Sequence, residues 1–490
     1  MKSSIAVLLF SLFLNIAFAQ TTTISGKVPS MKKGKITVNR PSNWLIDSDI
    51  NGVSLKKQIA QNGSFTLDLK AIDKEIILFT VWDSLQTKKL YEQYLYISKG
   101  DKIALNEKSD GKIIITDAGT NHSKLVGVST FYDVGEAYGD PLPDRVYERI
   151  NNFFQADKLL IEAYLAKYKP SKEVANAWNY HLEYARLAAF YSIYSNSSVR
   201  KNNPKWISVF NQLQDELAIS EDKALTSPSY QNYLGQFLFT KHQSLREDFD
   251  EKPVKFYDEW FYGDSLKAKA IMEIDYTNQL RQKIIERYFT GRVKEQMYGR
   301  VFYYLIHDQH FFNAKAIFND FERQYPNSQY IKHFKKPIQE AAARLENTIP
   351  KKAVFLEGNT TAKWDNILEH FKGKTVFLDM WGTWCSPCRE EIEKNAAVLK
   401  KYFEGKGVEF LYVTNYDKSE AKWKQLIAFY NLEGSHVFAN EALTDEIMKK
   451  IKVSSFPSYA IIDKNGTIAK VEYPIDREAL IQQIEATLKK

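Results

Sequence analysis

The order of hydrophobic and polar positions divides the chain into three regions. In the first, from Thr21 to about Asp117, short segments alternate apolar and polar residues, as in Ser64–Leu69, and turn pairs such as Asn62-Gly63 separate them. This alternation is typical of strands with one buried face, because successive side chains of a strand point to opposite faces of the sheet. We therefore predict an N-terminal antiparallel β sandwich over residues 20–120.

The second region has a helical period. Apolar residues recur every three or four positions in Asp144–Tyr168 and in Ser171–Tyr194, and X-Pro pairs such as Lys169-Pro170 interrupt the pattern. This spacing places the apolar side chains on one face of a helix. We predict an α-helical middle domain of antiparallel helix pairs over residues 121–347. Its many tyrosines are expected to serve in helix packing, with a peptide-binding groove as the alternative.

In the third region, apolar-rich segments alternate with amphipathic helices. Thr375–Met380 and Gly407–Thr414 have the continuous apolar character of buried parallel strands, and Glu390–Phe403 has a helical pattern between them. Strands that alternate with helices form a sheet that is covered on both faces. We predict a C-terminal α/β domain over residues 348–490, so the chain as a whole is expected to be multidomain.

The charge of the chain excludes one class of partner. The sequence has 67 Lys and Arg residues against 60 Asp and Glu residues, a net charge of +7, and the two signs are interspersed. A protein that follows a phosphate backbone usually carries a dense basic patch or stripe. We therefore predict no nucleic-acid partner.

The N terminus has the pattern of an export signal. Lys2 precedes the apolar stretch Ile5–Phe18, which ends in the small-residue pattern Ala17-Phe18-Ala19. This order predicts a secretory signal peptide over residues 1–19, cleaved before Gln20. The stretch is shorter than the roughly 20 apolar residues of a spanning helix, so a retained membrane anchor is the weaker alternative. We predict a periplasmic protein, in a compartment that is oxidising.

The chain has only two cysteines, Cys385 and Cys388. They are too few for a disulfide-stapled scaffold or for a cysteine-based structural zinc site, and a bridge between them would close only a small loop. Cys385 stands at the expected start of a helix, where free backbone N–H groups favour a thiolate. Cys388, one turn later, can attack a mixed disulfide formed at Cys385. The spacing therefore predicts dithiol exchange, with the disulfide itself as the redox centre.

A second motif has the spacing of a metal site. His307 and His310 would lie one turn apart on a predicted helix, a spacing that can bind a transition metal. The sequence offers no third ligand, and the glutamate of the zincin motif is absent. A polar helix face explains the pair, so we predict no metal and no cofactor besides the cysteine pair.

The surroundings of the cysteines match a known family. The segment Trp384-Cys385-Ser386-Pro387-Cys388 after a buried strand, with Phe456-Pro457 before a predicted hairpin and a terminal helix, resembles the thioredoxin superfamily. Within it, the pattern is similar to the exported TlpA/ResA-like thiol-disulfide oxidoreductases. The resemblance covers about residues 350–490 and implies a thioredoxin-like fold there. It also implies that Cys385 is the nucleophile and Cys388 the resolving thiol.

The resemblance extends to substrate contacts. It implies that Pro457 is in the cis form, so that Phe456 beside it can pair with an extended substrate chain. Trp384 and Pro387 are expected to shape the surface on which a partner protein lands.

Two acidic residues complete the implied site. Asp379 aligns with the buried acid of thioredoxins and would take the proton from Cys388, and Glu391 matches the active-site glutamate of the exported branch. The alternatives are a purely structural buried acid and an ordinary exposed helix residue. Glu393 stands where many members carry a proline that kinks the helix.

These residues favour a disulfide reductase. The resemblance implies that exported client proteins with disulfides are the substrates, and that a membrane thiol-reductant transporter of the DsbD/CcdA kind restores the reduced state. An oxidase or isomerase is the alternative within the class. A binding protein whose redox domain is accessory is the alternative outside it. A peroxiredoxin is disfavoured, because no lone cysteine stands in a peroxidatic context.

Overall fold

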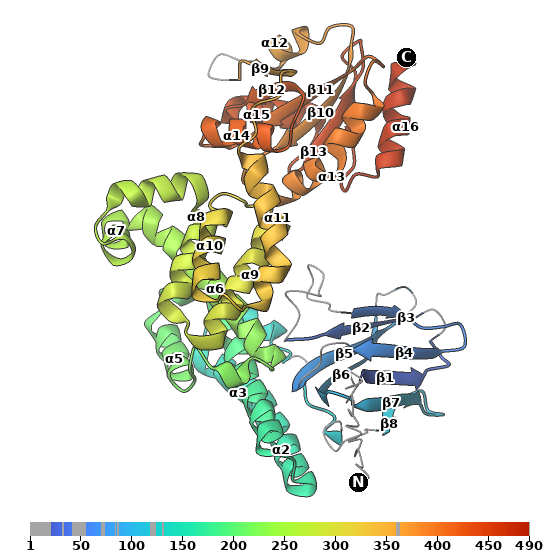
Figure 1. Ribbon diagram of the computed structural model, residues 1–490, viewed down its shortest axis with the longest axis vertical. Helices are drawn as coiled ribbons and strands as arrows, with labels where there is room; N and C mark the ends of the chain where they lie inside the picture. Colours follow the sequence, from blue (N-terminus) through green and yellow to red (C-terminus); the bar gives the residue numbers. More distant parts are fainter. Residues whose placement is uncertain are drawn as a thin grey trace, which may run out of the picture. The chain divides into compact units, whose positions relative to one another are not determined.

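The computed structural model describes residues 21–31, 34–41, 55–69, 74–83, 85, 88–117, 124–129, 132–358 and 363–489. The signal peptide predicted over residues 1–19 lies outside the described residues. The chain divides within helix α6 into two compact units, one ending at Gln236 and the other spanning Phe237–Lys490 (Figure 1). Over the described residues, none of the helices has both the length and the apolar character that a membrane crossing needs.

The first unit begins with two four-stranded sheets, in the orders β4-β1-β7-β8 and β3-β2-β5-β6. One hydrophobic cluster contains residues of both sheets, among them Ile24, Leu67 and Ile103 from the first and Val38 and Phe79 from the second. The strands are β1 (Thr22–Lys27), β2 (Lys35–Asn39), β3 (Leu55–Gln58), β4 (Ser64–Leu69), β5 (Lys74–Trp82), β6 (Lys89–Ser98), β7 (Lys102–Glu107) and β8 (Ile113–Asp117).

The prediction of an antiparallel arrangement holds in part. β4 shows the expected alternation, with Phe65, Leu67 and Leu69 buried, and most neighbouring strands are antiparallel. β1 and β7, however, run parallel, with Ile24 opposite Ile103. Between β1 and β7 the chain passes through the strands of the other sheet, and such a crossover lets β7 return in the same direction as β1.

The middle of the chain is helical, as its period predicts. The long predicted helices agree with the structure to within a residue or two, and Ser171 caps one of them by accepting a hydrogen bond from the N–H of Val174. Tyrosines pack between helices, as in the Tyr184–Tyr230 pair, whose buried rings lie 4.4 Å apart. The helices are α2 (Pro143–Tyr168), α3 (Lys172–Ser195), α4 (Ser198–Lys201), α5 (Pro204–Asp215), α6 (Pro228–Glu251), α7 (Pro253–Phe261), α8 (Ser265–Tyr288), α9 (Gly291–His307), α10 (Ala314–Gln324) and α11 (Gln329–Leu345), with short 3₁₀ segments η2 (Gly135–Gly139) and η3 (Asp222–Ala224).

The C-terminal region is one six-stranded sheet in the order β14-β13-β10-β11-β12-β9. β9, β12, β11 and β10 are mutually parallel, and β13 and β14 are antiparallel. The strands are β9 (Ala353–Leu356), β10 (Thr375–Trp381), β11 (Val408–Thr414), β12 (Gly434–Phe438), β13 (Ser458–Ile462) and β14 (Ile468–Val471). The helices are α12 (Trp364–Glu369), α13 (Ser386–Tyr402), α14 (Glu420–Phe429), α15 (Glu441–Ile451) and α16 (Arg477–Leu488).

The central strand β10 is buried at every position, because helices cover both faces of the sheet (Figure 1). Leu378 and Met380 belong to the hydrophobic cluster that α12 and α15 close. Asp379, between them, points to the opposite face, since side chains alternate along a strand. That face carries α13, and β10 therefore delivers the chain directly to the start of the helix that holds the cysteines.

Candidate active site

The two cysteines lie where strand β10 passes into helix α13. Cys385 is the N-cap of α13, its Sγ accepts a hydrogen bond from the N–H of Cys388 at 3.3 Å, and the two residues form a disulfide. Pro387 stands in the first turn, where its missing N–H costs nothing. The helix therefore begins at Ser386, directly after Cys385. Both cysteines are buried, with Cys385 4% exposed and Cys388 0% exposed, so the leading sulfur is the more accessible one.

The turn before Cys385 is held by the loop after β11. The N–H of Thr383 donates to Asp417 Oδ2 at 2.9 Å, and its hydroxyl donates to the other oxygen of that carboxylate. Trp384 Nε1 donates to the carbonyl of Asn415 at 3.0 Å. Sequence reasoning missed Asp417 and Asn415, which lie about 30 positions from the cysteines and carry no motif of their own.

Three aromatic side chains form a cluster that begins at Trp384, the neighbour of Cys385 in the chain. Trp384 is 46% exposed and meets the ring of Phe456 edge-on at 5.9 Å. Phe456 in turn meets the exposed Tyr416 edge-on at 6.1 Å. The Phe456–Pro457 peptide bond is cis, and Pro457 is buried while Pro387 is exposed. The structure thus brings Trp384 and Phe456 together and adds Tyr416, which the sequence did not mark.

Asp379 is a buried acid of β10, the strand that leads to the cysteines. Its side chain is 5% exposed, and its Oδ1 has no hydrogen-bond partner among the described residues. Burial raises the pKa of Asp379 well above its ordinary value, and the nearby carboxylate of Glu391 raises it further. Asp379 therefore holds its proton more strongly than an ordinary carboxyl does.

Glu391 is also buried, at 8% exposed, and burial raises its pKa. Its Oε2 accepts a hydrogen bond from Asn395 Nδ2 at 2.8 Å, and Asn395 Oδ1 accepts one from Arg477 Nε at 2.9 Å. Glu393, at the position of the expected proline, instead binds Arg344 from helix α11. The two glutamates have different roles, because one faces the interior and the other pairs with the helical region.

The segment after helix α9 contacts the first turn of α13. The hydroxyl of Ser386 donates to the carbonyl of Asp308 at 2.7 Å. Arg389, which is 0% exposed, donates to the carbonyls of Asp308 and Gln309, each at 2.7 Å. Its guanidinium also lies 2.9 Å from Nε2 of His310. Arg389 follows Cys388 directly in the sequence, but nothing in the sequence shows where its side chain points.

The prediction that His307 and His310 share one helix is wrong. Helix α9 ends at His307, Gln309 adopts a left-handed conformation with φ 56°, and His310 follows outside the helix. His310 therefore turns toward Arg389 rather than standing one helical turn from His307. Over the described residues, no group of three or more His, Cys, Asp or Glu side chains is arranged to hold a metal ion.

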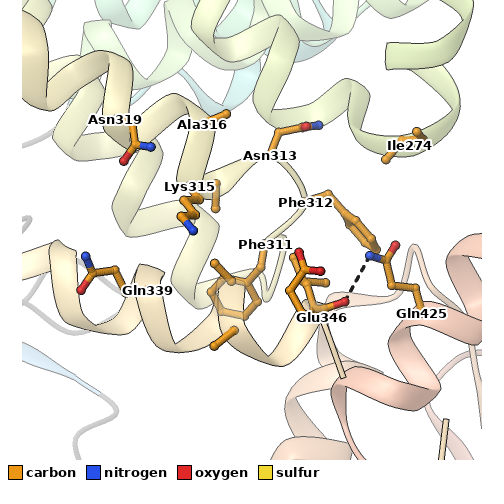
Figure 2. Close-up of a pocket in the computed structure, with 14 residues that line it drawn as sticks. Ile274, Phe311, Phe312, Asn313, Lys315, Ala316, Asn319, Gln339, Glu346 and Gln425 are labelled. Carbon is orange, nitrogen blue, oxygen red and sulfur yellow. Dashed lines mark hydrogen bonds between the residues drawn. The ribbon is translucent and has the colours of Figure 1, made fainter. Parts of the chain in front are cut away.

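A cavity of about 770 Å³ lies near this contact but apart from the cysteines. Phe311, Phe312 and Gln425 face it, and Gln425 Nε2 donates to the carbonyl of Leu345 at 3.5 Å (Figure 2). Its lining includes none of the predicted site residues. The candidate redox site thus lies at the start of α13 rather than in this cavity.

Comparison with known proteins agrees with this geometry. A family model described as thioredoxin-like matches residues 373–468, which span β10, the cysteines and the cis proline. The C-terminal domain is thus thioredoxin-like over these residues and is similar to the TlpA/ResA-like class of protein-disulfide oxidoreductases.

Individual relatives show how much of the chain the similarity covers. The chain is 37% identical over 123 residues to the thiol-disulfide oxidoreductase ResA of Bacillus thuringiensis subsp. konkukian, covering 25% of this chain and 66% of that protein. It is 32% identical over 117 residues to ResA of Bacillus subtilis, covering 23% and 61%. The chain therefore spans slightly less than two thirds of the length of these relatives. A solved thioredoxin domain of a thiol-disulfide oxidoreductase from Bacteroides vulgatus is 26% identical, over 24% of this chain and 82% of that one, with a TM-score of 0.22.

Proposed function

We propose that this protein is a periplasmic thiol-disulfide oxidoreductase that reduces disulfides of exported client proteins through Cys385 and Cys388. The observation that carries the proposal is the position of Cys385 at the N-cap of α13, bonded to Cys388 one turn later and bordered by the exposed ring of Trp384. The N–H of Cys388 already points at this sulfur, and the positive end of the helix favours the thiolate.

The reaction begins from the reduced pair. The Cys385 thiolate attacks one sulfur of a client disulfide, which forms a mixed disulfide and releases the other client sulfur as a thiolate that takes up a proton. Cys388 then loses its proton and attacks the Cys385 sulfur. The mixed disulfide breaks, the second client thiol leaves, and the Cys385–Cys388 disulfide forms. Two electrons have passed to the client, and no cofactor takes part.

The buried acids support the second step. Burial and the neighbouring Glu391 raise the pKa of Asp379, so its ionised carboxylate is a stronger base than an ordinary one. A carboxyl of this kind can take the proton that Cys388 loses, and Glu391 shares its surroundings. We assign Asp379 the proton transfer and Glu391 the tuning of its pKa.

The aromatic surface supports protein clients. Trp384 and Phe456 present large apolar faces beside the disulfide, and Pro387 is exposed next to them. We infer that the backbone of Phe456 pairs with an extended client segment, as in strand addition to a sheet edge. We propose that clients bind as unfolded or extended chains across this surface.

A reductase in an oxidising compartment needs a supply of electrons. We propose that a membrane thiol-reductant transporter of the DsbD/CcdA kind reduces the Cys385–Cys388 disulfide. In this exchange a thiolate of the transporter attacks the disulfide.

The proposal is tested by trapping. In the full chain, Cys388→Ala removes the resolving thiol, so clients should accumulate as mixed disulfides on Cys385 that reducing agent releases. Cys385→Ala is the matched control, because it removes the attacking thiol and leaves Cys388 in place. Equal trapping by the two variants, or failure of the reduced wild-type protein to reduce a peptide disulfide, would contradict the proposal. If the wild-type protein oxidises dithiols faster than it reduces disulfides, its function would be that of an oxidase rather than a reductase.

A further inference from the structure

Arg389 is a charged side chain enclosed beside the redox centre. It stands in the first turn of α13, one residue after Cys388, and it is 0% exposed. Its guanidinium donates to the carbonyls of Asp308 and Gln309 and lies 3.3 Å from the hydroxyl oxygen of Ser386. Gln309 is left-handed, which turns two successive carbonyls toward the same guanidinium. The segment 308–310 therefore forms a binding site for this guanidinium.

The groups that bind the guanidinium carry no charge. Two are backbone carbonyls, one is a serine hydroxyl, and the fourth is His310, whose Nε2 lies 2.9 Å away. Burial lowers the pKa of His310 well below its ordinary value, and the charge of Arg389 lowers it further, so the imidazole is neutral at pH 7. The Nε of Arg389 has no acceptor among the described residues. The other ionisable groups that face His310 are Lys422, Arg281 and His242.

Acidic groups are near the guanidinium but are otherwise engaged. Those that face it are Asp308, Asp417, Asp275 and Tyr430. Asp308 lies 3.6 Å from Arg281, and Asp417 accepts hydrogen bonds from Thr383. Burial raises the pKa of Asp275 to about 7. Over the described residues, none of these carboxyls pairs directly with the guanidinium. A buried cation without a counter-ion is costly, because its attraction to an anion is what offsets desolvation.

Reduction of the cysteine pair would introduce an anion on the same helical turn as Arg389. When the disulfide opens, a thiolate forms at Cys385, on the same helical turn as Arg389 and adjacent to Ser386, which the guanidinium contacts. A nearby cation lowers the pKa of a thiol and favours the reduced form of a dithiol pair. We propose that Arg389 is a positioning residue whose charge, held in place by the segment 308–310, stabilises the reduced form of the Cys385–Cys388 pair. This inference rests on the proposed function and gives the helical region a part in it.

The test is the thiol-disulfide equilibrium of the full chain with glutathione. Two glutathione thiols are oxidised to glutathione disulfide while the Cys385–Cys388 bond is reduced to two thiols. Arg389→Gln should lower the equilibrium constant for this reduction at least about tenfold, or about 30 mV in potential. The same variant should shift the pH profile of Cys385 alkylation to higher pH. Arg389→Lys keeps the charge and Lys401→Gln removes an exposed charge from the far end of α13, so both should remain close to wild type.

A second pair of variants keeps the test decisive if Arg389→Gln does not fold. His310→Glu leaves Arg389 in place and gives it a counter-ion, so it should lower the constant in the same direction. His310→Gln, its neutral control, should not. The inference would be overturned if the equilibrium constant were unchanged in both Arg389→Gln and His310→Glu. It would also be overturned if Arg389→Lys lowered the constant as much as Arg389→Gln does. In either case, a wild-type cysteine pair that exchanges normally with glutathione would leave the proposed function standing. Wild-type cysteines that do not exchange with glutathione would overturn both.

Discussion

Arg344 binds Glu393 through two parallel hydrogen bonds, from Nη1 to Oε1 at 2.9 Å and from Nη2 to Oε2 at 2.6 Å. The same guanidinium lies 4.0 Å over the ring of Phe429. This pair joins helix α11 to the redox helix α13 at a distance from the cysteines. Together with the contact of the segment 308–310 on Arg389, it fixes α13 to the helical region at two places within one compact unit.

The Arg344–Glu393 pair should make a small but measurable contribution to stability. Both side chains are 36% exposed, so water screens the charges, but the geometry is bidentate. A double-mutant cycle with Arg344→Ala and Glu393→Ala should give a coupling of about 0.5–1 kcal/mol in the free energy of unfolding. The exposed pair Lys336–Glu340, 3.8 Å apart, is the control and should couple more weakly. Equal coupling in both pairs would show that the bidentate contact adds nothing.

Asp379 should matter for the resolving step rather than for the first attack. Asp379→Asn keeps the shape of the side chain but removes its capacity to take a proton, so release of a client from the mixed disulfide should slow by about 10²-fold. Single-turnover reduction of a peptide disulfide measures this step. Alkylation of Cys385 at neutral pH should change by no more than about twofold.

The matched control for Asp379 is Glu390→Gln, a carboxyl on α13 that binds Lys394 at the surface. It should leave both rates unchanged. A normal rate of release in Asp379→Asn would assign the buried acid a structural role alone.

Asp275 should make stability depend on pH between its unfolded and folded pKa values. Burial raises its pKa from an ordinary value near about 4 to about 7 in the folded chain. In that interval the folded state holds a proton that the unfolded state has lost. The free energy of unfolding should therefore fall as pH rises, by up to about 1.4 kcal/mol per pH unit from this residue, and the fall should stop above about pH 7.

Urea unfolding of Asp275→Asn over the range from about pH 4 to about pH 9 measures this effect. The variant should gain stability relative to wild type as pH rises toward 7 and then keep a constant difference. Asp258→Asn, at an exposed carboxyl, is the control. A difference between Asp275→Asn and wild type that does not vary with pH would contradict the prediction.

Gly382 should be needed for the position of Trp384. A Cβ at Gly382 would lie 2.6 Å from Nε1 and 2.9 Å from Cε2 of the Trp384 ring, so the ring would have to move and its hydrogen bond to Asn415 would break. Gly382→Ala should cost about 1–3 kcal/mol of stability and raise KM for a peptide disulfide. Trp384→Ala in the same assay should raise KM without the clash. An unchanged KM in both variants would show that Trp384 does not contact clients.

Much of the fold follows from local patterns. The alternation in Ser64–Leu69 and the apolar stretch at Thr375–Met380 predict strands, because burial on one face or on both sets their periodicity. The start of α13 at the cysteines is equally local. The edge strand β9, in contrast, escaped prediction, since its side chains are half-buried or exposed and its pattern depends on pairing with β12.

The parallel pairing of β1 with β7 also escaped prediction. A crossover through a second sheet leaves no local trace, so the direction in which a strand returns cannot be inferred from the strand itself. The end of helix α9 at His307 is a similar case. The left-handed Gln309 ends the helix, and no proline or glycine marks the place in the sequence.

The sequence by itself determined the redox motif of Cys385 and Cys388, because a strand end, an N-cap and one helical turn are short-range features. Only the tertiary structure decided what surrounds them. The carbonyls that bind Arg389 belong to residues about 80 positions earlier in the chain. The turn before Cys385 is bound by a loop about 30 positions later. Long-range contacts of this kind depend on how packed elements meet, since backbone carbonyls and buried carboxyls at those places carry no pattern of their own.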